Sequence, residues 1–80
     1  MNELRSEVIK ILKRELKLYH KILSVHQHLE NDLRIGSLEK AQIIFALEQR
    51  FNIFSNSNIS EILTVGDCVK YVEQELKETG

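Results

Sequence analysis

The chain has 80 residues, a net charge of −1 at pH 7, three glycines, and neither proline nor tryptophan. A chain of this length builds one small core, and this composition favours helices joined by short polar segments over a sheet. The sequence has no apolar stretch long enough to cross a membrane, and its one cysteine excludes an internal disulfide and fits a reducing compartment. We therefore expect a single domain over residues 1–80 that is cytoplasmic and monomeric, without stable insertion into a membrane.

The charge is unevenly distributed along the chain. Residues 1–28 carry a net charge of +3 and residues 29–80 carry −4, which predicts a polarised surface. The basic part is too weakly charged to indicate a nucleic-acid partner, and the second predicted helix is neutral overall. We therefore do not expect a helix-turn-helix protein that binds DNA.

Apolar residues at steps of three and four predict a first helix from about residue 3 to residue 18. Asn2 can cap its start, and lysine and arginine occupy the opposite face. A basic amphipathic helix can lie on a membrane surface, but the later helices offer complementary apolar faces, so we expect this one to pack into the core. Its apolar side consists of Leu4, Val8, Ile11, Leu12 and Leu16.

Residues 19–36 form a long connection whose apolar residues follow no regular spacing. A connection of this length inside a small domain usually has local structure or a function. Ser24 and Gln27 have the spacing of a capping box, so part of the connection can be helical.

The sequence contains no recognisable catalytic or metal-binding arrangement. His20, His26 and His28 lie close together, but no CxxC or HExxH pattern accompanies them, so we interpret them as solvated loop side chains and expect no metal site. Glu39 and Glu48 are too far apart along one helix to act as paired carboxylates. No nucleophile stands beside a base, and no glycine-rich loop could cradle a phosphate. We therefore do not expect an enzyme.

The second helix is predicted from Ser37 or Leu38 to Phe51. Apolar residues surround most of its circumference, which is typical of a central helix with neighbours on several sides. Ser37 stands at its start, on an exposed turn after Gly36. Its hydroxyl can have one of two roles. It can cap the free N–H groups of the first turn, or it can attach an anion that the positive end of the helix dipole favours.

Two further helix starts follow. Asn58 and Glu61 have capping-box spacing and predict a short helix near residues 59–63. Thr64 and Asp67 repeat that spacing and predict the start of the last helix.

The last helix is predicted from about residue 65 to residue 78. We interpret Cys68 as a small buried apolar residue, because Lys70 is the one positive charge close to it in the sequence, and a reactive thiol needs an electropositive setting. The apolar face of this helix consists of Val65, Cys68 or Val69, Val72 and Leu76.

Residues around the second helix follow a characteristic order. Asp32-Leu33 forms a turn, Ser37-Leu38 begins the helix, and Leu47-Glu48 and then Phe51 end it. In this order and at this spacing they resemble the acyl carrier proteins. Residues of the first and last helices extend the resemblance over nearly the whole chain: Val8, Ile11, Leu12, Leu16, Thr64, Val65, Tyr71 and Val72.

The resemblance implies an all-α, acyl-carrier-protein-like four-helix bundle, with three main helices and one short helix, in up-and-down order after a long first connection. It also implies that this connection packs Leu23 and Leu29 against the bundle. By the same resemblance, Ser37 carries 4′-phosphopantetheine, whose thiol holds an acyl group as a thioester for partner enzymes. These partners are a phosphopantetheinyl transferase and the enzymes that load and use acyl groups. The residues expected to dock them are Asp32, Leu33, Leu38, Glu39, Ile44 and Glu48.

In carrier proteins the inner surface of this helix can also open to hold a fatty chain. By resemblance the candidates here are Ile44, Phe45 and Leu47, and the alternative for each is an ordinary core residue.

The sequence departs from the family pattern in three ways. Gly36 replaces the aspartate that usually precedes the serine, and Arg34 replaces the glycine that usually follows Asp-Leu. The second helix is also neutral, because Lys40 and Arg50 balance its two glutamates, whereas the family's helix is strongly acidic. We therefore expect a specialised carrier in lipid, fatty-acid or polyketide-type biosynthesis. The alternative is a helical protein-interaction module that keeps the fold without a prosthetic group.

Overall fold

The computed structural model describes residues 2–53 and 59–79 and confirms the all-α class. The fourth short helix is not confirmed, because the structure has only a three-residue 3₁₀ turn where that helix was expected. Asn58, its expected cap, lies outside the described residues. The elements are α1 (Asn2–Leu16), α2 (Ser37–Phe51), the 3₁₀ turn η1 (Ile59–Glu61) and α3 (Val65–Thr79).

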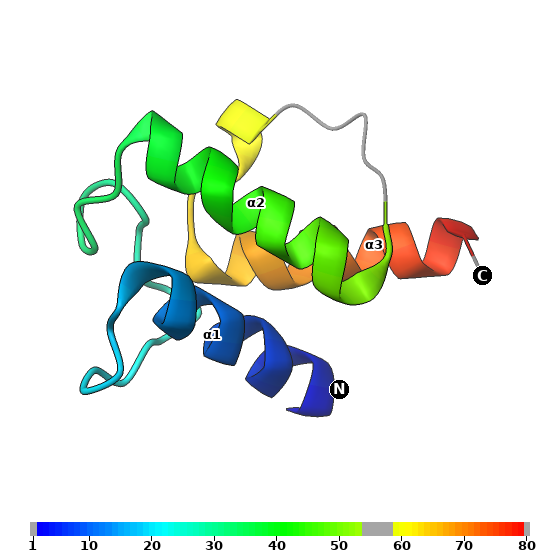
Figure 1. Ribbon diagram of the computed structural model, residues 1–80, viewed down its shortest axis with the longest axis horizontal. Coiled ribbons are helices and arrows are strands. Elements are labelled where there is room, and N and C mark those ends of the chain that lie inside the picture. The colour runs from blue at the N-terminus through cyan, green and yellow to red at the C-terminus, as the bar shows by residue number, and fades with distance from the viewer. Residues whose placement is uncertain (1, 54–58, 80) are drawn as a thin grey trace.

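The three helices pack against one another, but they do not alternate in direction (Figure 1). α1 runs opposite to α2, whereas α2 and α3 both begin at the same end of the molecule and run the same way. In an up-and-down order of four elements the second and the last run the same way, so the directions of the three helices agree with the predicted order, although the short helix between them is not confirmed. Both α2 and α3 start beside the long first connection.

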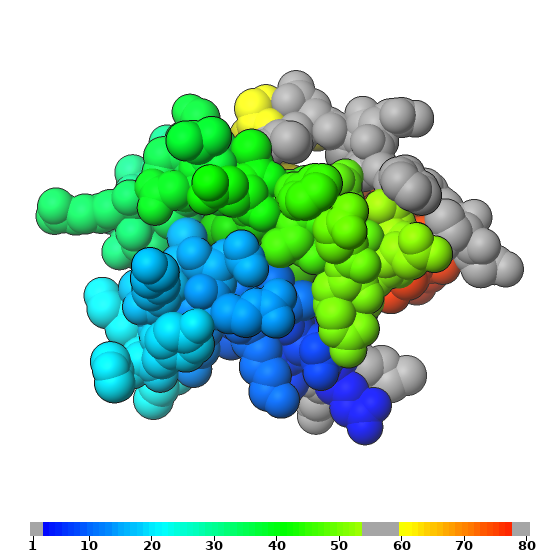
Figure 2. Space-filling view, in the orientation of Figure 1, coloured from blue at the N-terminus to red at the C-terminus, as the bar shows by residue number. Residues whose placement is uncertain are grey.

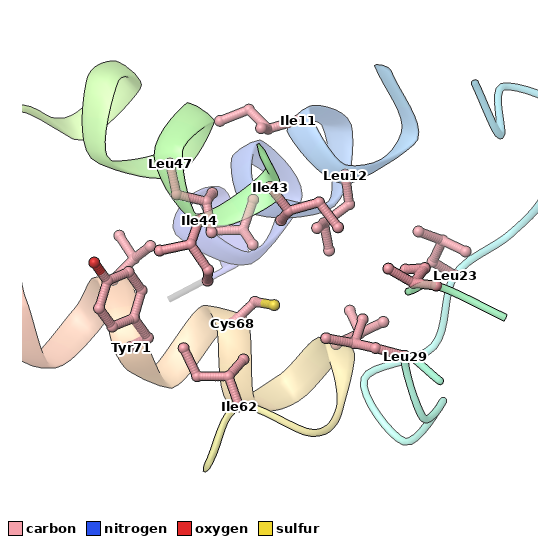
Figure 3. Close-up of a cluster of buried hydrophobic side chains, with 14 of the residues drawn as sticks. Ile11, Leu12, Leu23, Leu29, Ile43, Ile44, Leu47, Ile62, Cys68 and Tyr71 are labelled. Atoms are coloured by element: carbon pink, nitrogen blue, oxygen red, sulfur yellow. The ribbon is translucent and has the colours of Figure 1, made fainter. Parts of the chain in front are cut away.

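Side chains from all three helices meet in one core (Figure 3). Leu12 of α1, Leu47 of α2 and Val72 of α3 are fully buried, and Leu23 and Leu29 of the long connection join them, as the resemblance implied. Tyr71 is also buried, whereas the predicted Leu76 is partly exposed. The remaining buried apolar residues are Val8, Ile11, Ile35, Ile43, Ile44, Ile53, Ile62, Val65 and Cys68.

α2 does not bury every side of its largely apolar circumference. Its buried residues are Lys40, Ile43, Ile44 and Leu47, which form one stripe along the helix. Leu38 lies outside that stripe and remains 74% exposed. α2 therefore packs against α1, α3 and η1, as expected of a central helix, and its remaining side presents apolar residues to solvent.

α1 ends two residues earlier than the sequence predicted. Lys17 has a left-handed backbone with φ of 57°, and the Leu18 N–H donates to the Lys13 carbonyl at 2.8 Å. A hydrogen bond between residues five apart, closing over a residue with a left-handed backbone, is the Schellman motif that ends many helices. The backbone geometry at Lys17 therefore ends α1 at Leu16.

The long connection is held by backbone hydrogen bonds to the start of α3. The Leu29 N–H donates to the Leu63 carbonyl at 2.8 Å, and the Gly66 N–H donates to the Val25 carbonyl at 2.9 Å. The expected helix at Ser24 does not form, because this segment forms a turn that pairs with α3 instead. The connection is therefore an ordered part of the fold.

α3 begins with the capping box that the sequence predicted. The Asp67 N–H donates to the Thr64 hydroxyl at 3.1 Å, and the Thr64 N–H donates to the Asp67 carboxylate at 3.0 Å. The Leu63 N–H also donates to this carboxylate. Asp67 therefore satisfies backbone donors that would otherwise lack partners at the helix start.

No helix in the described part of the chain is both long enough and apolar enough to span a membrane.

Gly66→Ala should destabilise the protein by about 1–2 kcal/mol, although alanine is the better helix former. A Cβ at this position would lie 3.0 Å from the Val25 carbonyl oxygen and 3.3 Å from the Val25 Cβ, so the backbone pairing would have to shift. Urea unfolding measures the change. The matched control is Gly36→Ser, where the space is open and the backbone is extended, and it should cause no loss. Equal stability of Gly66→Ala and the wild type would contradict this account.

Asp67→Asn should cost about 1 kcal/mol at pH 7, the usual value of a helix cap. Burial raises the pKa of Asp67, but the hydrogen bonds from Leu63 and Thr64 and the charge of Lys70 outweigh it and lower the pKa below its ordinary 3.8. The stabilisation is thus present above pH 3.8 and lost as the pH falls through the lowered folded-state pKa. Urea unfolding between pH 7 and pH 2 should show the gap closing in acid. A gap that stays constant would contradict the prediction.

Candidate functional site

Ser37 is the first residue of α2 rather than its cap. Gly36 occupies the N-cap position with an extended backbone, and its N–H donates to Glu39 Oε1 at 3.1 Å. The first helical bond runs from the Lys40 N–H to the Gly36 carbonyl at 3.0 Å. Among the described residues the Ser37 hydroxyl has no hydrogen-bond partner, and its side chain is exposed. The interpretation of Ser37 as a cap is therefore wrong, and its hydroxyl is free for another role.

The backbone around this hydroxyl suits an anion. The N–H groups of Ser37, Leu38 and Glu39 precede the first helical hydrogen bond and have no acceptor within the helix. They also lie at the positive end of the helix dipole. A Cβ built on Gly36 would meet only the end of the Glu39 side chain, at 3.7 Å. A phosphate ester on Ser37 therefore fits the space and the local electrostatics.

A rigid turn precedes this site. The His28 N–H donates to the Asp32 carboxylate at 2.7 Å, and the Asp32 N–H donates back to the His28 carbonyl at 2.9 Å. Next to it, Arg34 has a left-handed backbone with φ of 56°, a conformation that glycine adopts more readily. By the resemblance noted in the sequence, Arg34 replaces a glycine, which would adopt this left-handed backbone without strain. Ile35 is buried and fixes the turn to the core.

The structure spreads the residues expected for docking over several environments. Leu38 is exposed beside Ser37, Glu39 is exposed but holds the Gly36 N–H, and Leu33 is half-buried. Glu48 is half-buried, and its carboxylate accepts the Tyr71 hydroxyl hydrogen bond at 3.0 Å. The surface near Ser37 is therefore formed by the turn and the first residues of α2.

Ile44 belongs to the core rather than to this surface, since only 3% of it is exposed. Leu47 is also fully buried. Phe45, expected on the inner surface, is instead 61% exposed. It lines a groove between α1 and α2 together with Arg14 and Arg50, on the face that Figure 2 presents.

Lys40 is a residue whose position the sequence did not suggest. It is the only buried charged residue among those that the structure describes, with 6% exposure. Its burial could have been predicted only from its spacing: it lies three residues after Ser37 and four before Ile44, which places it on the buried stripe of α2.

Cys68 is fully buried between the helices, as the sequence predicted. Burial raises the pKa of its thiol to about 12, and Asp67 adds to the increase while Lys40 opposes it. His28 is a structural residue of the turn, because its Nδ1 accepts the Asn31 N–H at 3.3 Å. Among residues 2–53 and 59–79 no cluster of histidine, cysteine and carboxylate side chains could hold a metal ion.

The sequence of this chain is similar to those of known proteins. An acyl carrier protein from Porphyromonas gingivalis is 30% identical over 78 residues, which cover 96% of this chain and all of that protein. The chain belongs to the acyl carrier protein family. An acyl carrier protein from Prochlorococcus marinus is 32% identical over 72 residues, which cover 89% of this chain and 90% of that protein. No family model matches the chain.

The fold agrees with this assignment to the acyl carrier proteins. The solution structure of an apo doublet acyl carrier protein from prodigiosin biosynthesis superposes with a TM-score of 0.80 at 27% identity. The match covers 91% of this chain and 36% of that one, so this chain spans about a third of the doublet protein. The resemblance seen in the sequence is confirmed. The alternative of an interaction module without a carrier function is not favoured.

The Cys68 thiol should be unreactive in the folded protein. A pKa of about 12 instead of the ordinary 9.0 lowers the thiolate fraction at pH 8 about a thousandfold. Ellman's reagent should therefore label the native chain very slowly and the urea-unfolded chain at once. The Ser37→Ala variant is the proper sample, because it leaves Cys68 as the chain's single possible thiol. Rapid labelling of the native variant would contradict the burial of this side chain.

Proposed function

We propose that this acyl carrier protein holds acyl groups as thioesters on a 4′-phosphopantetheine arm attached to Ser37. One observation carries the proposal: the Ser37 hydroxyl is exposed and without a partner among the described residues, at the first position of α2. The free N–H groups of Ser37, Leu38 and Glu39 would hold the phosphate of the arm. When bound, the arm supplies the thiol that forms the thioester.

The chain's own part in this chemistry is to present the serine. Gly36 leaves space beside the hydroxyl for the modifying enzyme, and the hydrogen bonds of Asp32 hold the preceding turn in place. No base on this chain lies in hydrogen-bond contact with Ser37 among the described residues, so the phosphopantetheinyl transferase would activate the hydroxyl. The protein therefore acts as a substrate-presenting partner of enzymes, and we propose that it is a cytoplasmic monomer of one domain.

The exposed residues around Ser37 are our candidates for contact with the transferase and with acyl-loading enzymes. Leu38 offers an apolar side chain next to the attachment point, and Asp32, Leu33 and Glu39 flank it. Because Glu48 is bonded to Tyr71, its part in docking would require that hydrogen bond to open.

We further propose a specialised carrier in lipid, fatty-acid or polyketide-type biosynthesis. α2 lacks the strongly acidic surface of the general carriers: Glu39 is its one exposed carboxylate, Glu48 is half-buried, and Arg50 adds an exposed positive charge that pairs with Glu7 at 3.3 Å. The doublet carrier that shares the fold comes from prodigiosin biosynthesis, which fits this proposal. Loading at normal rates by a ketosynthase of general fatty-acid synthesis would contradict it.

Intact mass spectrometry tests the attachment. With coenzyme A and a broad-specificity phosphopantetheinyl transferase, the wild type should gain the mass of one arm, and Ser37→Ala should gain none. Because Gly36 is the cap, Ser37→Ala should change the free energy of unfolding by less than about 0.5 kcal/mol, so that loss of modification cannot be attributed to unfolding.

The matched control is Ser6→Ala, which removes an exposed serine of α1 and should keep the mass gain. An arm that still attaches to Ser37→Ala would disprove the assignment of the site. No gain in the wild type, while a control carrier is modified, would favour a dedicated transferase or a chain without the arm.

A further inference from the structure

One stripe of α2 leads from the attachment point into the core. Ser37, Lys40, Ile44 and Leu47 follow at steps of three, four and three residues, so they share one face of the helix. Ser37 is exposed, whereas the other three are buried. Figure 3 shows Ile44 directed toward Tyr71 and toward Cys68, which come from α3. The stripe therefore passes from the surface into the contact between α2 and α3.

Lys40 is the first buried residue on this stripe. It is 6% exposed and shares the buried side of α2 with Ile44, which is directed toward Cys68 of α3. Lys40 therefore lies on the side of α2 that faces α3. No described residue forms an ion pair or a side-chain hydrogen bond with the Lys40 ammonium. The described side chains include no fully buried nitrogen or oxygen without a partner, so the ammonium keeps some access to solvent.

A buried cation beside the attachment point changes the free energy of inserting an acyl chain between the helices, and the change depends on the chemistry of that chain. Transfer of an alkanoyl chain from water to apolar surroundings is favourable, and the nearest buried apolar residues to Ser37 along α2 are Ile43 and Ile44. To reach them, the chain must displace Lys40 or bury its charge, and burial of an unpaired charge is unfavourable. A carboxylate at the end of the cargo would instead form a charge-assisted hydrogen bond with the ammonium.

We infer that Lys40 is a specificity-determining residue that opposes insertion of a plain alkanoyl chain between α2 and α3 and favours acyl groups that end in a carboxylate. The inference rests on the proposed attachment of the arm to Ser37, and it names the class of cargo for that same site. It concerns the interior beside the arm, not the enzymes that load it.

Two cargoes of equal length test the inference. Hexanoyl-coenzyme A and adipoyl-coenzyme A give arms that differ only at the chain end, which is a methyl group in one and a carboxylate in the other. A broad-specificity transferase attaches each to the wild type, to Lys40→Met, and to Lys10→Met, a control that removes an exposed lysine of α1. Mass spectrometry verifies each loading. The thermal midpoint is then compared with that of the same variant carrying the free thiol arm.

In the wild type and in Lys10→Met, adipoyl should raise the midpoint by about 4 °C or more and hexanoyl should leave it unchanged. In Lys40→Met, which keeps a long side chain without the charge, hexanoyl should raise the midpoint and adipoyl should not. Amide chemical shifts of Ile44 and Cys68 should move with the stabilising cargo in each case, because a cargo that stays in solvent would not reach them.

Stabilisation of the wild type by hexanoyl at least as large as by adipoyl would overturn the inference. So would identical responses of Lys40→Met and the wild type. Failure of the transferase to attach any arm to Ser37 is a different result, because it would overturn the proposed function and the inference with it. An attached arm with no difference between the two cargoes would overturn the inference alone.

Discussion

A relay of backbone hydrogen bonds fixes the position of Ser37 relative to the rest of the fold. The Leu29 N–H binds the Leu63 carbonyl just before α3, and the Ile35 N–H binds the Leu29 carbonyl at 2.9 Å. Ile35 is buried and lies two residues before Ser37. The start of α3 therefore holds the long connection, and the connection holds the start of α2. This pairing depends on Gly66, where no side chain separates the two backbones. The proposed attachment residue, which partner enzymes would have to recognise, gains a fixed position in this way.

The relay also explains why α2 and α3 begin at the same end of the molecule (Figure 1). Both helix starts border the same connection, so their positive dipole ends lie on the same side. At the start of α3, the backbone N–H groups of Leu63 and Thr64 donate to the Asp67 carboxylate. At the α2 start, the Gly36 N–H donates to Glu39 and is the only backbone N–H there bonded to a side chain among the described residues. The next N–H groups have no acceptor within the helix. The difference leaves the α2 start as the better place for an added phosphate.

The charges of α2 separate this chain from an acidic carrier. Lys40 is buried on the side of α2 that faces α3. The Arg50 guanidinium pairs with Glu7 of α1 and lies 5.4 Å from the centre of the Phe51 ring. One positive charge is thus directed inward and the other toward α1. The sequence showed that α2 is neutral overall. Only the packing shows that Lys40 is buried whereas Arg50 is exposed beside α1. The proposed effect on the cargo concerns Lys40, whereas Arg50 changes the charge of the exposed side of α2.

The sequence alone determined the helical class, the start of α2 to within one residue and the capping box at Thr64, because periodicity and capping are local properties of a chain. It also identified Ser37 as the candidate attachment residue, because the order of residues around it resembles that of the acyl carrier proteins. Tertiary structure decided the rest. Ser37 proved to be the first helical residue because Gly36 can take the extended cap conformation, and Ser24 starts no helix because its segment pairs with α3. The burial of Lys40 and the exposure of Phe45 depend on which side of α2 faces α3. A helix with apolar residues on most sides does not specify that orientation by itself.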